Sequence, residues 1–158
     1  MTPYEELLEV ASNEGVTVVD YELGEKMLGL YCDGYILIGK QAGANERYCT
    51  LAEELGHHFT AASNIVELDN IDKCKQERLG RRWGFEKILP LNKIVSAIID
   101  GYDNLPTLAE QLEVTPEYLQ ETLVYYGQKY GPRIEHNGYI VLFSDVSITV
   151  YPAMDEII

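Results

Sequence analysis

The spacing of apolar residues changes near residue 44, and this change limits the possible folds more than any other feature of the chain. Beyond that point apolar residues recur at i, i+3, i+4 and i+7, which predicts an amphipathic helix over residues 44–62. Its apolar stripe consists of Tyr48, Leu51, Ala52, Leu55, Phe59 and Ala62. Glu53, Glu54 and His57 project from the opposite side of this helix.

The first forty residues predict one helix followed by a small antiparallel sheet. Thr2-Pro3 marks the start of that helix. Short β-type runs follow at residues 16–21, 27–31 and 35–38. Asp33-Gly34, between the last two runs, is typical of a type I′ hairpin turn. We expect this sheet to pack on the helix at residues 44–62.

The rest of the chain predicts helices and then strands. The helices are expected at residues 71–89, 92–101, 107–112 and 115–130, and the strands at residues 133–135, 139–143 and 146–151. Pro90 ends the first of these helices, and Asn137-Gly138 marks a second hairpin turn. We therefore predict a single α+β domain over residues 1–158. Residues 1–90 would form its core, and residues 91–158 a helical segment plus a C-terminal β-hairpin.

The composition argues against several classes of partner. The chain has 12 Lys and Arg against 26 Asp and Glu, a formal net charge of −14, which disfavours nucleic acid and anionic membranes. It has no run of about 18 apolar residues that could span a bilayer. Cys32, Cys49 and Cys74 lack metal-ligand spacing and are expected to be buried free thiols. We expect a soluble cytoplasmic protein without a direct nucleic-acid or membrane partner.

The charge is also unevenly distributed. Residues 72–93 carry seven basic and three acidic side chains, a local excess of four positive charges. Such a stretch could offset buried carboxylates or dock an acidic segment of a substrate. A solvated basic face would have the same composition.

The polar face of the helix at residues 44–62 carries a pattern with possible chemistry. Glu53 and His57 are four residues apart, so they lie one turn from each other and could share a ligand. Glu54 lies beside them, and His58 lies one turn beyond Glu54. This spacing resembles the H-E-x-x-H arrangement, in which two residues hold zinc and the glutamate acts as a base. An ordinary solvated helix face would show the same residues.

Glycines on two helices favour a real site over a solvated face. Gly56 lies in a helix interior, where glycine costs roughly 1 kcal/mol of stability relative to alanine. A glycine at this position is explained if another backbone or a substrate comes close to the helix. Glu77, Gly80 and Gly84 fall on one face of the next helix at i, i+3 and i+7. The two glycines would let the helices approach, and Glu77 would enter the same interface as a third metal ligand.

At this point the sequence resembles a known family. Residues 51–63, LAEELGHHFTAAS, and residues 75–90, KQERLGRRWGFEKILP, resemble the ImmA/IrrE family of metallopeptidases, which are encoded largely by prophages, integrative elements and related bacterial loci. The family has L-A-H-E-L-G-H on its active-site helix. A second helix carries a ligand glutamate, a small residue, an aromatic residue and a Leu-rich end before proline. The matching positions here are Leu51, Ala52, Glu54, Leu55, Gly56, His57, Glu77, Gly80, Trp83 and residues 88–90.

The resemblance implies a zincin-like minimal metallopeptidase and assigns roles to individual residues. His57 and Glu77 would be zinc ligands, and Glu54 would be the general base. One position departs from the family, because Glu53 stands where the first histidine is usual. A carboxylate oxygen binds zinc at about the same distance as an imidazole nitrogen, so Glu53 can substitute, and another divalent metal could be tolerated. His58 is the alternative nitrogen ligand.

The resemblance also implies a function. A zinc-dependent hydrolase of this type would cut a protein substrate, with a helix-turn-helix transcriptional repressor of a prophage or integrative element as the expected target. A second hypothesis belongs to another class. The chain could be a catalytically degenerate protease fold that binds a repressor without cutting it, as an antirepressor or interaction module, and Glu53 favours this alternative.

Residues 107–123 have the spacing of a helix-turn-helix but the wrong charges for DNA. Glu117 and Glu121 lie on the would-be recognition helix, which carries no Lys or Arg up to residue 123 and would repel phosphates. Glu113 stands where a turn glycine would be expected. We therefore expect a structural helical hairpin here.

Overall fold

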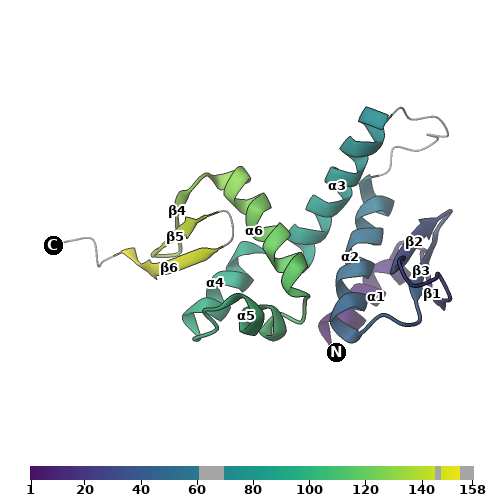
Figure 1. Cartoon of the computed structure of the whole chain (residues 1–158), viewed down its shortest axis with the longest axis horizontal. Helices are drawn as coiled ribbons and strands as arrows, with labels where there is room; N and C mark the ends of the chain where they lie inside the picture. The colour runs from purple at the N-terminus through teal and green to yellow at the C-terminus, as the bar shows by residue number, and fades with distance from the viewer. Residues whose placement is uncertain (61–69, 145–146, 154–158) are drawn as a thin grey trace. The chain divides into compact units, whose positions relative to one another are not determined.

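The computed structural model describes residues 1–60, 70–144 and 147–153. Within them it is α+β, with six helices and two three-stranded sheets (Figure 1). The chain divides into two compact units, Met1–Ile88 and Leu89–Ile158, which are described separately. No helix in these residues is long and apolar enough to cross a membrane.

The first unit begins with helix α1, Pro3–Asn13, and its predicted N-terminus is confirmed. The hydroxyl of Thr2 accepts a hydrogen bond from the backbone N–H of Glu5 at 3.1 Å. The Glu5 carboxylate accepts one from the backbone N–H of Thr2 at 2.9 Å. This reciprocal capping box satisfies two backbone donors that a helix start otherwise leaves without partners.

The first sheet contains β1 Thr17–Tyr21, β2 Gly29–Cys32 and β3 Tyr35–Gly39 in the order β1-β3-β2. The hairpin between β2 and β3 is confirmed, since both turn residues, Asp33 and Gly34, have positive φ, 45° and 81°.

The prediction of a purely antiparallel sheet is wrong, because β1 pairs with β3 in parallel. Strand β3 carries Ile36 and Ile38, both fully buried. The most apolar strand therefore takes the central position, and β1 must lie along its other edge rather than beside β2.

Two helices complete the first unit, α2 Ala44–Thr60 and α3 Asn70–Ile88, and they pack against each other along their lengths (Figure 1). Helix α2 also covers β2 and β3. Its predicted apolar stripe is buried at Tyr48, Leu51, Ala52 and Leu55. Phe59 is instead 38% exposed and stacks on Trp83 of α3, with ring centroids 4.7 Å apart. The predicted helix end at Ala62 lies outside the described residues.

The second unit contains three helices, α4 Leu91–Ile99, α5 Leu105–Gln111 and α6 Pro116–Tyr130. They precede a sheet formed by β4 Arg133–His136, β5 Tyr139–Phe143 and β6 Ile148–Pro152. The sheet is antiparallel in the order β4-β5-β6, so the three predicted C-terminal strands are confirmed and the hairpin is part of a three-stranded sheet. Positive φ at Asn137 and Gly138, 49° and 83°, confirms the predicted turn. Val146, the predicted start of the last strand, lies outside the described residues.

Two smaller expectations have mixed outcomes. The turn between α5 and α6 places Glu113 at φ 60°, so the left-handed backbone expected of a glycine forms with glutamate instead. All three cysteines lie outside disulfides, but only Cys49 is buried; Cys32 on β2 and Cys74 on α3 are exposed. The prediction of three buried thiols is therefore wrong for two of them, because both lie on outward-facing positions of their elements.

Candidate metal centre

The structure brings three of the predicted ligand residues together. Glu53 and His57 lie one turn apart on α2, and Glu77 reaches them from α3. One donor atom from each residue lies within 4.8 Å of the other two, and His57 Nε2 is 3.6 Å from Glu77 Oε1. Tetrahedral zinc with bonds of about 2.1 Å requires donors about 3.4 Å apart. The donor cluster of Glu53, His57 and Glu77 therefore fits a small divalent ion after modest side-chain rotation.

The two helices can place these donors because two glycines lie at their closest approach. A Cβ atom on Gly56 would overlap the carbonyl oxygen of Gly80, and one on Gly80 would lie 2.9 Å from Nδ1 of His57. Gly84, one turn further along α3, is also buried. The expected role of Gly56 is confirmed: another backbone comes too close for a side chain.

Glu54 lies beside the donor cluster in a different environment. Burial raises the pKa of Glu54 from 4.5 to about 7, and the negative charges of Glu53 and Glu77 add to this shift. The backbone N–H of Tyr31 donates a hydrogen bond to the Glu54 carboxylate, which opposes the rise in pKa. A carboxylate with a pKa near neutrality can both accept and return a proton at physiological pH.

Strand β2 reaches Glu54 through a residue without a side chain. A Cβ atom on Gly29 would overlap Cγ2 of Thr50 and lie 3.3 Å from Cγ of Glu54. Gly29 thus lets the edge strand β2 lie directly against α2 at the position of the candidate base.

The structure places His58 in another network. Its Nδ1 lies 2.9 Å from the hydroxyl of Tyr31, and its Nε2 lies 3.3 Å from Oε2 of Glu14. Both ring nitrogens therefore have partners away from the donor cluster. Of the two alternatives for the remaining ligand, Glu53 is the one that the structure brings to His57 and Glu77.

Two residues near the centre, Gly29 and Tyr31, did not emerge from the sequence. Arg81 emerged only as part of the basic stretch at residues 72–93, which could offset buried carboxylates. Arg81 Nε lies 3.4 Å from Oε1 of Glu53. Arg81 lies four residues after Glu77 on one helix, and this spacing indicates that both side chains lie on the same side of that helix. Gly29 and Tyr31 carried no such signal, because their proximity to Glu54 depends on how the sheet packs on α2.

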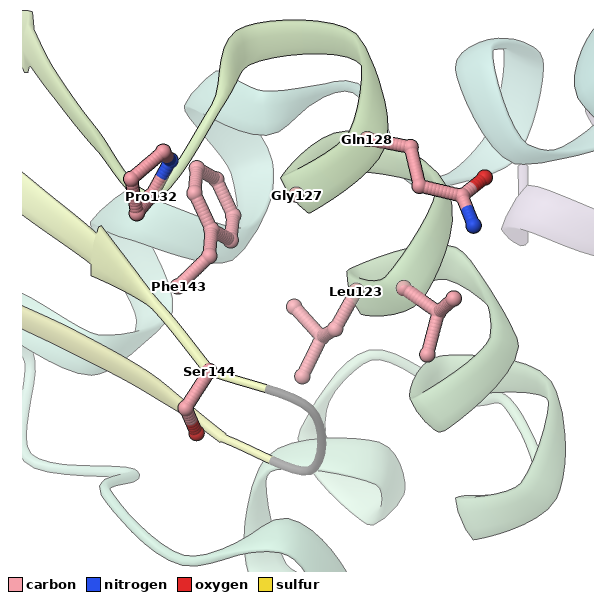
Figure 2. A pocket seen from close by; sticks show the side chains of 7 residues that line it. Leu123, Gly127, Gln128, Pro132, Phe143 and Ser144 are labelled. Atoms are coloured by element: carbon pink, nitrogen blue, oxygen red, sulfur yellow. The ribbon is translucent and has the colours of Figure 1, made fainter.

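A pocket of about 470 Å³ lies in the second unit, between α6 and the end of β5. Figure 2 shows Leu123 and Phe143 facing it, with Gly127 on the helix opposite the Phe143 ring. Among the residues that the structure describes, its lining side chains include no ionisable group, and the Ser144 hydroxyl lies 2.6 Å from that of Ser147. The described lining of the pocket therefore offers mainly apolar contact.

The chain matches no known protein family and no curated protein sequence. Membership of the ImmA/IrrE family therefore stays a prediction that rests on residues 51–63 and 75–90. The geometry of the donor cluster is a separate observation.

Proposed function

We propose that this chain is a zinc-dependent, zincin-like peptidase of the ImmA/IrrE type. Glu53, His57 and Glu77 would hold the ion, and Glu54 would act as general base. One observation carries the proposal: three potential ligands from two helices converge beside a buried carboxylate whose pKa lies near 7. Solvated helix faces do not bury a carboxylate against two others, since the mutual repulsion is unfavourable unless a cation compensates it.

The proposed chemistry is hydrolysis of a peptide bond. A bound divalent ion would supply a Lewis acid for the scissile carbonyl and lower the pKa of a water molecule. Glu54 accepts a proton from the attacking water as the new C–O bond forms. It then delivers that proton to the leaving amine as the C–N bond breaks. Glu54 is buried beneath β2, and this burial raises the pKa of its carboxyl group, which favours return of the proton in the second step.

The proposed substrate is a protein in the cytoplasm, a helix-turn-helix repressor of a prophage or integrative element. The support for this substrate is the resemblance carried by residues 51–63 and 75–90. We propose no direct contact with nucleic acid, since the chain as a whole carries 14 excess negative charges.

Glu53 supports the second candidate, a repressor-binding antirepressor without protease activity. A ligand set with two carboxylates and one imidazole neutralises more of the ion's charge than two imidazoles and one carboxylate would. Weaker Lewis acidity would slow hydrolysis without affecting a protein-binding surface.

One experiment separates the two candidates. The zinc-loaded full chain is incubated with the repressor encoded beside its gene, and fragments are identified by mass spectrometry. Cleavage that disappears with Glu54→Gln supports the peptidase, with exposed Glu9→Gln on α1 as the matched control. An intact repressor in a stable stoichiometric complex supports the antirepressor. Elemental analysis that finds no metal after reconstitution rules out the peptidase.

A further inference from the structure

We propose that Arg81 is a positioning residue that holds the Glu53 carboxylate in the donor cluster and so makes glutamate usable at this ligand position. The inference rests on the proposed metal site and goes beyond it. Arg81 Nε lies 3.4 Å from Oε1 of Glu53, across the interface between α3 and α2.

Glu53 needs such a positioning contact, here called the tether, more than a histidine at the same position would. Its side chain is 32% exposed, so it has a path into solvent. The carboxylates of Glu54 and Glu77 lie close to it, and like charges repel one another in a partly buried site. A glutamate also has more rotatable bonds than a histidine, so it loses more conformational entropy when it is held in one position. Without a tether, Glu53 would turn towards water.

Helix α3 is placed to supply the tether. Arg81 follows Glu77 by four residues, so both project from the same side of α3 towards α2. Gly80 lies between them at the closest approach of the two helices. One helix therefore supplies a ligand, Glu77, and the group that orients a second ligand, Glu53.

The geometry of a carboxylate allows both contacts at once. Its two oxygens can each accept, so an arginine on one oxygen leaves the other for an ion. Metal-binding carboxylates in proteins are commonly hydrogen-bonded in this way, and loss of such partners typically weakens metal binding 10- to 100-fold.

The net charge of the donor cluster also supports a positioning role for Arg81. Glu53 and Arg81 together carry no net charge, as a neutral imidazole does. With Arg81 included, the cluster of Glu53, His57 and Glu77 has one net negative charge, the same as two histidines and one glutamate.

The test measures zinc affinity of the metal-free full chain by competition with a chromophoric chelator. Arg81→Met keeps the aliphatic stem and removes the donors, and we expect the Kd for Zn²⁺ to rise about tenfold. Arg78→Met is the matched control: it removes an exposed cation from the same helix and should change the Kd less than twofold. An unchanged or lower Kd for Arg81→Met overturns the proposal, as does an equal loss with Arg78→Met.

The same Arg81→Met substitution, made in a protein that already carries Glu53→His, tests whether Arg81 acts through Glu53. In Glu53→His protein, Arg81→Met should leave the Kd within twofold, because the imidazole needs no tether. The same tenfold loss in that background contradicts the proposal. Because Arg81 is half-exposed, Arg81→Met should fold, and its circular dichroism spectrum checks this.

The outcomes distinguish this inference from the proposed function. If the wild-type chain binds no zinc, the metal site itself is wrong, and the role of Arg81 falls with it. If zinc binds and Arg81→Met is without effect, only the role of Arg81 is wrong. If zinc binding depends on Arg81 but no substrate is cut, the positioning role of Arg81 is supported and the proposed peptidase activity is contradicted.

Discussion

Gly56 of α2 and Gly80 of α3 lie in direct backbone contact, so that a methyl group on Gly56 would overlap the carbonyl oxygen of Gly80. This contact brings Glu77 to within 3.6 Å of His57. Two donors on α2 and one on α3 can share an ion only while the helices stay this close. Helix packing and metal binding are therefore properties of the same interface.

Gly56→Ala should destabilise the first unit although alanine has the higher helix propensity. The propensity gain is about 1 kcal/mol, whereas forcing two helix backbones apart costs about 3 kcal/mol, the upper end of the usual cost of overpacking. We expect a lower free energy of unfolding in urea and a higher Kd for zinc. Gly127→Ala is the control, because Gly127 is also helical but its new Cβ would lie 3.4 Å from Phe143, an ordinary contact. Equal stability of the Gly56→Ala and wild-type proteins would contradict the close approach.

Zinc should stabilise the folded chain through the donor cluster. An ion that binds the folded state alone adds about 2.7 kcal/mol at a free concentration 100-fold above its Kd. We expect thermal unfolding to shift upward with Zn²⁺ and to return with a chelator. His57→Ala and Glu77→Gln should abolish the shift. His136→Ala should retain it, because the partners of His136 are Asn92 and Asn137, both in the second unit. A shift that survives loss of His57 would place the ion elsewhere.

Stability of the metal-free chain should fall with rising pH because of Glu54. Its pKa is raised to about 7 in the folded state, so the folded chain binds this proton more tightly than the unfolded chain. The free energy of unfolding therefore decreases from about pH 4.5 to about pH 7 and levels off above. We expect a loss on the order of 2 kcal/mol after partial solvent screening.

Glu54→Gln isolates this contribution, since the amide keeps the size of the side chain and cannot ionise. With a chelator present, we expect it to match the wild type near pH 5 and to exceed its stability at pH 8 in urea unfolding. Glu9→Gln, on the exposed face of α1, should show no pH-dependent difference. If Glu54→Gln is no more stable than the wild type at pH 8, Glu54 is not a buried carboxylate with a raised pKa.

Local signals in the sequence predicted most elements. A helix cap at Thr2 and a turn at Asn137-Gly138 depend on residues next to each other in the chain, so the sequence alone identifies them. Periodicity likewise located α2 and α3 to within two residues at the ends that the structure describes. These features need no knowledge of what the element packs against.

Contacts between distant segments were not predictable in the same way. The parallel pairing of β1 with β3 depends on which strand is most buried, and the hairpin signal concerns only β2 and β3. His58 meets Tyr31 and Glu14, which are 27 and 44 residues away. Helical spacing placed His58 beside the candidate ligands, but these two partners decide the direction of its ring.

The approach of β2 to Glu54 gives the last prediction. Gly29→Ala should lower stability, because the new Cβ would overlap Cγ2 of Thr50 and crowd Cγ of Glu54. Overpacking of this kind typically costs about 1 to 3 kcal/mol. It should also weaken the hydrogen bond from the Tyr31 backbone to Glu54, so any cleavage activity should fall with it.

A second substitution tests the cause. Thr50→Ala removes the methyl group that the new side chain would meet, so Gly29→Ala/Thr50→Ala should regain most of the stability lost in Gly29→Ala. A double-mutant cycle by urea unfolding measures this coupling. Additive losses of unfolding free energy would show that glycine is needed at position 29 for its backbone conformation and not to avoid the Thr50 methyl group. Its position in β2, within a regular antiparallel register to Ile38, argues for the steric cause.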